Sequence, residues 1–509
     1  MKCIKYNIWQ AIVTTLLLAG FLTSCSDTLR LEPKSVITVK SFWKTENDVK
    51  GALNGMYSDF RNANKMMFQL GEGRSEVLGL GIAGSGGYDL FYNNTLNPNN
   101  LDAQGNYSSG LDWRVFYTIV NSSNLLIKYV PSINFASEEE KNRVLAEAYT
   151  MRAFIYFLMA KTWGDLPLRT DPIEGYDANT VNVARSPVNE IFSLIKSDIE
   201  QAMQLYPDNQ ILSGRYRWSK VSANALKADV YLWTGKLLGG GQQDFETALA
   251  ACNEVAAGDT DLLENFNDIF RYDNKGNREV LMSIRFQLLE ETPVFSYFRD
   301  MYMFGGLMPS GVSEYTRNFI GTNTGGGHSV WAPTELVRNQ FNTKDSRRLG
   351  TFYEIYNHLD GDSTYFTAVV MKGTGAVNSG NVREYVSDII VYRFAEVLLM
   401  KAEAKNALGM DPSPELNQLR ARAFGEDFPE FAFRNADQLK NDEFIISERL
   451  LELMCEGKRW WDLIRFRKAF ELVPSLQGKE AQQHLLLFPI PTKTLSLEPL
   501  VVQNPGWEN

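Results

Sequence analysis

The chain has 509 residues, of which 44% are hydrophobic, 12% aromatic and 22% charged, and this composition excludes collagen-like, coiled-coil and wholly disordered proteins. Its net charge of −10 argues against nucleic-acid binding, because binding to phosphates needs a basic surface. Four cysteines are too few for a disulfide scaffold in a chain of this length. Neither they nor the three histidines have the spacing of metal ligands, and we expect no metal and no cofactor.

Residues 1–24 have the features of a secretory signal peptide. Two lysines precede an apolar run at 11–22, which is too short for the ~20 residues of a membrane helix. The run closes with L-T-S-C at 22–25, which looks like a bacterial lipobox. We expect Cys25 to carry the lipid anchor and the polar residues 25–40 to form a tether. The alternative is a plain signal peptide followed by a chance cysteine.

Amphipathic helices are predicted along the mature chain. After the N-cap signal at Thr45, the apolar residues Val49, Leu53, Met56 and Phe60 recur on one helical face. Segments of this kind cover residues 45–64, 138–163, 187–206, 223–256 and 391–408. The segment 223–256 contains glycines at 239–241 between two helices rich in small residues, as in a tetratricopeptide-like hairpin. The sequence therefore predicts a mainly α fold with tetratricopeptide-like helical repeats.

Long irregular segments separate these helices, at 71–111, 291–331, 343–388 and 409–440. A β-biased run at 279–286 predicts a short strand among them. Irregular segments of this length inside a compact protein usually have a function. We therefore searched them for binding residues.

Aromatic and amide residues gather in the segments 71–111 and 291–331. A sugar ring has an apolar face and a rim of hydroxyls, so its site combines aromatic rings with Asn, Asp or Arg. The predicted ligand-binding residues are Tyr88, Tyr92, Asn93, Asn94, Tyr107, Tyr297, Tyr302, Tyr315, Arg317 and Trp331. The alternative is that the aromatic rings pack these loops onto the helices.

Three carboxylates near the C-terminus, Glu448, Glu452 and Glu456, are spaced for one face of a helix. Paired carboxylates can catalyse glycoside hydrolysis. Charged residues that offer ion-pair partners interleave at helical spacings, namely Arg449, Arg459, Asp462 and Arg465. The pattern therefore favours structural ion pairs, and we predict no catalytic residue.

Seven segments in order resemble the SusD/RagB family, the surface lipoproteins of Bacteroidetes nutrient-uptake systems. They are LTSC (22–25), SFWKTENDVKGALNGMYSDF (41–60), DWRVFYTIVNSSNLL (112–126), EAYTMRAFIYFLMAKTWGDLPL (147–168), LNQLRARA (416–423), ISERLLELMCEGKRWWDLIRFRKA (446–469) and LLLFPIPTKTLSLEPLVVQNPGWEN (485–509).

The resemblance implies four tetratricopeptide-like repeats that support a loop-rich, irregular half carrying the ligand site. It also implies a lipid-anchored protein on the outer surface of the outer membrane, partnered with a SusC-like TonB-dependent transporter. Members of the family bind nutrients and have no catalytic activity of their own. We therefore expect an oligosaccharide-binding protein; the alternatives are a peptide-binding lipoprotein of the same fold and a surface glycosidase.

Overall fold

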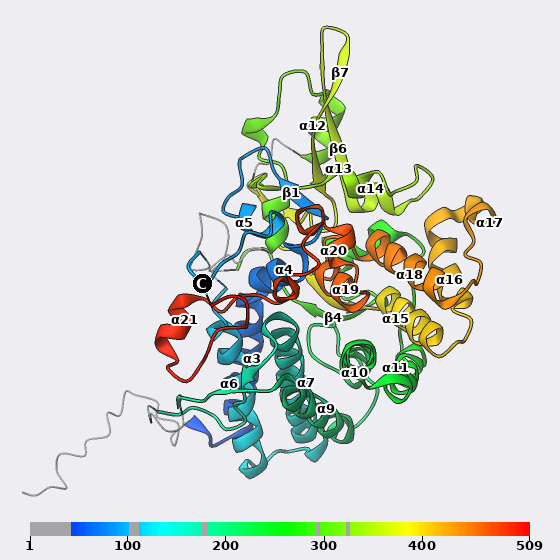
Figure 1. Cartoon of the computed structure of the whole chain (residues 1–509). Coiled ribbons are helices and arrows are strands. Elements are labelled where there is room, and N and C mark those ends of the chain that lie inside the picture. The colour runs from blue at the N-terminus through cyan, green and yellow to red at the C-terminus, as the bar shows by residue number, and fades with distance from the viewer. Residues whose placement is uncertain are drawn as a thin grey trace, which may run out of the picture.

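The computed structural model describes residues 42–100, 111–175, 177, 181–290, 296–321 and 326–508. The predicted signal peptide, Cys25, the tether and Tyr107 lie outside the described residues. Helices dominate the described part, and its strands form short two-stranded antiparallel sheets (Figure 1). The predicted mainly α fold is confirmed.

The helices are α3 (Glu46–Asn62), α4 (Asn64–Glu72), α5 (Asp89–Tyr92), α6 (Arg114–Tyr129), α7 (Glu138–Trp163), α9 (Val188–Leu205), α10 (Lys220–Leu237), α11 (Gly241–Ala256), α12 (Glu314–Ile320), α13 (Glu335–Arg338), α14 (Arg347–Thr351), α15 (Phe394–Ala407), α16 (Ser413–Phe424), α17 (Phe428–Phe431), α18 (Gln438–Leu453), α19 (Arg459–Arg465), α20 (Ala469–Leu472) and α21 (Thr492–Leu497). The strand pairs are β1 (Leu78–Leu80) with β5 (Trp331–Pro333), β2 (Leu166–Pro167) with β3 (Arg185–Ser186), β4 (Val280–Ile284) with β10 (Ile389–Arg393), β6 (Phe352–Leu359) with β7 (Asp362–Val370), and β8 (Ala376–Val377) with β9 (Arg383–Glu384).

The predicted helices form close to their expected positions. Thr45 caps α3 through a capping box with Asp48, and the predicted apolar stripe of α3 is buried. Helix α7 spans the predicted residues 138–163, and the segment 223–256 divides at its glycines into α10 and α11. These helices pack in antiparallel pairs, α6 with α7, α7 with α9 and α10 with α11, and the row continues through α15 to α18 (Figure 1). We call this row with α3 and α19 the helical scaffold.

The structure differs from the sequence prediction at three places. Residues 391–393 belong to β10 rather than to the following helix, because they pair with the buried strand β4. The segment 409–440, predicted to be irregular, contains α16 and α17. The segment 343–388 contains the β6–β7 hairpin, whose turn at Asp360 and Gly361 has positive φ at both residues.

The described part has two principal hydrophobic cores. The larger core runs through the helical scaffold and reaches β4, β5 and β10. A smaller second core lies beneath α12 and the β6–β7 hairpin and contains Tyr302, Met303, Val312, Ile320, Ile355, Val369 and Tyr385. We call the region of α5, α12–α14, β1 and β5–β9 the loop-rich half; it lies above the row of helices in Figure 1.

Candidate functional site

Four of the predicted ligand-binding aromatics are core residues. Tyr88, Tyr297, Tyr302 and Trp331 are at most 4% exposed. Trp331 packs edge-to-face against Tyr88 at a centroid distance of 4.1 Å, and Tyr297 stacks on Phe68 at 3.8 Å. A ring buried in this way has no free face for a sugar, so the prediction that these four rings form a ligand platform is wrong for this structure. Tyr88, Tyr297 and Trp331 pack the loop-rich half against the main core, as the alternative interpretation expected, whereas Tyr302 packs in the second core.

The hydroxyl groups of these tyrosines also have internal partners. Tyr88 donates to the carboxylate of Asp300, Tyr297 donates to the carbonyl of Cys455 at 3.1 Å, and Tyr302 donates to the carbonyl of Ile320 at 2.9 Å. Burial raises the pKa of Tyr88 and of Tyr302 above the ordinary value. These bonds satisfy polar groups that would otherwise be costly to bury.

The predicted ligand-binding residues at the end of α5 differ in their exposure to solvent. Asn94 is buried, and its amide oxygen accepts a 2.7 Å hydrogen bond from Nε of the buried Arg74. This amide therefore supports the chain and is not available to a ligand. Tyr92 is half-buried and Asn93 is exposed at the end of the same helix. A ligand role for these two residues stays a prediction.

Among the predicted aromatics that the structure describes, Tyr315 has the most exposed side chain, at 72%. It lies on α12, where Asn318 and Phe319 follow at i+3 and i+4 and are also exposed. The rings of Tyr315 and Phe319 are nearly parallel, with 6.1 Å between centroids and 9° between planes. Phe319 also contacts the ring of Tyr353 on β6 at 4.8 Å. We call Tyr315, Asn318, Phe319 and Tyr353 the α12 aromatic face.

Local sequence explains why α12 presents this face. The side chain of Ser313 caps the helix by accepting from the backbone N–H of Thr316 at 3.1 Å. The helix ends at Gly321, whose φ of 66° is the left-handed conformation typical of a C-terminal cap. Between these ends, Ile320 is fully buried in the second core. Burial of this one side turns Tyr315 and Phe319 toward solvent.

Arg317, the remaining predicted residue, lies on α12 and binds the loop that precedes this helix. Its Nε donates to the carbonyl of Val312 at 3.1 Å, and its Nη2 donates to the carbonyl of Pro309. The side chain is half-buried. Its observed contacts are therefore those of a positioning residue for α12, and a ligand contact stays a prediction.

Sequence reasoning missed three members of the α12 aromatic face. The motif S-E-Y-T-R-N-F at 313–319 begins with an N-cap residue and places two aromatic residues at i and i+4. That spacing could have identified Asn318 and Phe319 together with Tyr315. The contact with Tyr353 depends on the β6–β7 hairpin and has no local signal.

The three C-terminal carboxylates are bound in a buried ion-pair network. Arg347 donates to Glu448 at 2.7 Å and to Glu452 at 3.1 Å. Arg393 contacts Glu452 at 2.6 Å and Glu456 at 2.9 Å. The interpretation as structural ion pairs is confirmed, because these carboxylates are at most 7% exposed and occupied by cations.

The partners of this network differ from those that the sequence indicated. They come from distant segments, because α18 ends at Leu453 and the chain reverses at Cys455, whose φ is 65°. Glu456 thus lies beyond the helix that carries the other two carboxylates. The interleaved residues pair elsewhere: Arg449 with Asp462, Arg459 with Glu76, and Arg465 with Asp229 and Glu403.

The electrostatics of the network oppose acid–base catalysis. Burial alone raises the pKa of Glu452, but the guanidinium groups of Arg422, Arg393 and Arg347 outweigh it and hold that pKa well below the usual range. The pKa of Glu456 is lowered in the same way by Arg393 and Lys372. Carboxylates held ionised in this way cannot donate a proton to a leaving group at neutral pH.

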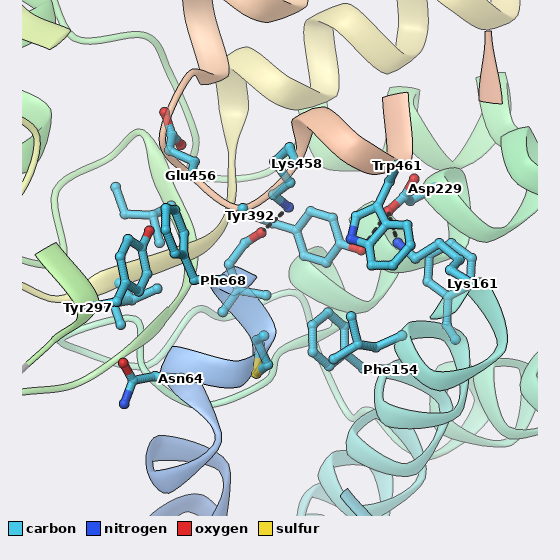
Figure 2. A pocket seen from close by; sticks show the side chains of 17 residues that line it. Asn64, Phe68, Phe154, Lys161, Asp229, Tyr297, Tyr392, Glu456, Lys458 and Trp461 are labelled. Atoms are coloured by element: carbon cyan, nitrogen blue, oxygen red, sulfur yellow. Dashed lines mark hydrogen bonds and ion pairs between the residues drawn. The ribbon is translucent and has the colours of Figure 1, made fainter. Parts of the chain in front are cut away.

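A small pocket of about 60 Å³ lies beside this network, between α4, α7, β10 and the α18–α19 link (Figure 2). Figure 2 shows Phe154, Lys161, Asp229 and Trp461 at one end and Phe68 with Tyr297 at the other. This volume has room for a few waters. It is far smaller than the 300–1,000 Å³ of typical ligand sites and cannot hold a sugar chain.

Lys161 is a buried lysine that lines this pocket. Its ammonium lies 3.9 Å from the centroid of the Phe157 ring and 3.9 Å from Asp229. Burial lowers the pKa of Lys161 to about 8. Burial raises the pKa of Asp229, but Lys161 and Arg465 outweigh it and bring that pKa to about 2. The pair holds α7 to α10 inside the helical scaffold.

The described residues contain no cluster of three or more His, Cys, Asp or Glu side chains placed to hold a metal ion. Within the same ranges, every helix is too short or too polar to cross a membrane.

Comparisons with known proteins agree on one family. Residues 329–507 match the family model described as "SusD family", and residues 31–232 match the model described as "Starch-binding associating with outer membrane". SusD-like protein P38 of Formosa agariphila is 29% identical over 520 residues, which cover 95% of this chain and 96% of that protein. The starch-binding protein SusD of Bacteroides thetaiotaomicron is 23% identical over 441 residues, which cover 74% and 77%. The solved structure of B. fragilis NanU is similar with a TM-score of 0.83 and 30% identity over 94% of this chain and all of that one.

Proposed function

The chain belongs to the SusD/RagB family, and on this basis we propose that it is a cell-surface lipoprotein that captures oligosaccharides at the α12 aromatic face. The observation that carries the proposal is the pair of exposed, nearly parallel rings of Tyr315 and Phe319. Such a pair offers apolar stacking surface to the CH faces of consecutive sugar residues. Asn318, which is exposed between them, supplies an amide for sugar hydroxyls.

Family relationships support glycans as the ligand class. One matching family model is described as starch-binding, and a relative that aligns with 74% of this chain is a starch-binding protein. An exposed aromatic face with a neutral amide fits such ligands better than it fits peptides, whose binding would call for a more charged groove. The oligosaccharide would then pass to a partner TonB-dependent outer-membrane transporter.

The proposal includes a lipid anchor at Cys25. The L-T-S-C sequence places this cysteine after an apolar signal segment, and the two fatty chains of a diacylglycerol on its thiol would hold the protein at the outer membrane. Replacement of Cys25 by Ala should release the mature protein or leave it as a precursor. Detergent partitioning and fatty-acid labelling would test this, and a labelled, membrane-bound Cys25→Ala variant would contradict it.

A binding panel tests the function itself. The mature protein is incubated with oligosaccharides and with peptides, and calorimetry and product analysis are applied to every mixture. We expect oligosaccharide binding without turnover, and we expect Tyr315→Ala to weaken it. Tyr356→Ala is the matched control, because Tyr356 is an exposed tyrosine of the same region that pairs with Tyr365 instead of α12. Binding of peptides alone, or formation of hydrolysis products, would contradict the proposal.

A further inference from the structure

A second pocket lies in the helical scaffold, between α3, the loop at 214–218 and the end of β4. Its volume is about 230 Å³ and it is open to solvent. This is below the 300–1,000 Å³ of sites for drug-sized ligands, and it suits a molecule of one sugar residue. In Figure 1, α3 and β4 lie apart from α12, so the pocket is separate from the α12 aromatic face.

Helix α3 contributes a polar stripe to this pocket. Asn54, Ser58 and Arg61 occur at i, i+4 and i+7, on a different side of the helix from its buried apolar stripe. On an isolated helix such a stripe would simply face water. Here Tyr216 and the end of β4 line the same hollow, in which Asn54 and Ser58 remain exposed to solvent.

Two arginines from distant segments converge on the pocket. Arg285 follows β4, and its guanidinium lies 4.9 Å from the centroid of the Tyr216 ring, which also lines the pocket. Arg61 comes from α3. The described lining contains these two cations and no carboxylate.

Arg61 is held in place but not fully paired. Its Nη1 donates to both carboxylate oxygens of Glu290, at 2.9 and 3.0 Å. Its Nε is buried and has no hydrogen-bond partner among the described residues. A ligand carboxylate would share the guanidinium of Arg61 with Glu290, and Arg285 would supply the second cation.

We propose that this pocket binds the carboxylate of an acidic sugar. The two guanidinium groups would hold the carboxylate, and Asn54 and Ser58 would bind ring hydroxyls. Tyr216 supplies an aromatic wall beside them. The proposal does not depend on the α12 aromatic face, because it rests on residues of the helical scaffold.

Calorimetry with four probes tests this site in the mature protein: glucuronate, galacturonate, glucose and acetate. We expect at least one uronate to bind more tightly than both glucose and acetate, and its affinity should fall as the salt concentration rises. Failure of both uronates to bind would overturn the proposal. Affinity for acetate equal to that for the uronates would also overturn it, because the site would then recognise only a simple anion.

Single substitutions test whether the uronates bind in this pocket. Arg285→Gln should weaken uronate binding by at least about tenfold, because a hydrogen bond to a charged group contributes about 1.5–3 kcal/mol. Arg278→Gln is the matched control, since Arg278 is an exposed arginine outside this lining. Tyr315→Ala should leave uronate binding unchanged, which separates this proposal from the glycan site on α12. Unchanged binding in Arg285→Gln would contradict the proposed site.

Discussion

The helical scaffold and the loop-rich half each contain residues placed against the usual preference of their type. In the scaffold, charged residues such as Arg393 and Glu452 are completely buried and paired with one another. In the loop-rich half, aromatic residues such as Tyr315 and Phe319 are exposed to solvent. The comparison teaches that residue type alone does not distinguish a binding residue from a core residue. The side of the element on which the residue lies decides its role.

Aromatic residues within the loop-rich half also differ from one another in their exposure to solvent. Tyr88 and Trp331 lie in segments rich in glycine and asparagine, yet both are buried against the main core. Tyr315 lies on a short helix whose buried side is occupied by Ile320. We therefore expect substitutions in the first group to affect stability and substitutions in the second group to affect binding.

The largest stability effect is expected from the buried ion-pair network. Glu452→Ala removes the shared partner of Arg347, Arg393 and Arg422 and leaves buried charge unpaired. Loss of one partner of a buried pair costs about 3–5 kcal/mol. Lys344→Ala is the control, because its pairs with Asp427 and Glu430 are exposed and contribute less than ~1 kcal/mol. Equal denaturation midpoints for the two variants would show that the network does not stabilise the scaffold.

Trp331→Ala tests the buried aromatics of the loop-rich half. The side chain is 2% exposed and contacts the rings of Phe68, Tyr88 and Phe91, so its removal opens a cavity. Such truncations cost about 3–5 kcal/mol. The thermal melt should shift down, while the affinity measured well below the melting temperature should stay near that of the parent protein. A normal melt with lost binding would instead make Trp331 a ligand contact.

The junction between the two regions should respond to pH through Glu72. This buried carboxylate accepts backbone hydrogen bonds from Cys455 at 2.8 Å and from Lys458 at 3.0 Å. Burial raises the pKa of Glu72 to about 7, although these bonds oppose it. The folded protein therefore binds the proton more tightly than the unfolded chain, and the contribution to stability is present below about pH 4.5 and is lost as pH rises through 7.

Glu72→Gln should remove this pH dependence. A pKa raised from 4.5 to about 7 corresponds to about 3 kcal/mol across that interval. Urea denaturation at several pH values would show a difference between parent and variant that changes in this direction. The exposed substitution Glu471→Gln is the control. A difference that stays constant from pH 4.5 to 7 would show that Glu72 is ionised throughout.

Sequence patterns predicted the scaffold well because its helices carry local signals. The Thr45 cap, the apolar stripe of α3 and the glycines between α10 and α11 each depend on residues close in the chain. The β6–β7 hairpin was missed even though Asp360-Gly361 is a favoured hairpin turn. The cations that pair with Glu452 could not be predicted, because they come from α14, β10 and α16, which only the folded chain brings together.

The candidate site was only partly predictable for the same reason. Tyr315 was identified from composition, but composition identified Tyr88, Tyr297, Tyr302 and Trp331 equally well. Tyr297 and Trp331 are buried against Phe68 of α4, and Tyr302 is buried against Tyr385, so the partners lie far away in sequence. The helical spacing of Tyr315 and Phe319 was the local signal that separates the exposed group.

Stability and glycan binding are expected to reside in different regions, and the double variant Tyr315→Ala/Phe319→Ala tests this most directly. Calorimetry with an oligosaccharide bound by the parent protein gives Kd, and a thermal melt of the same sample gives Tm. Loss of the stacking surface should cost about 1–3 kcal/mol of binding free energy. This predicts a Kd raised about five- to 150-fold, with Tm close to that of the parent. An unchanged Kd, or a loss of binding that only accompanies a lower Tm, would contradict the account.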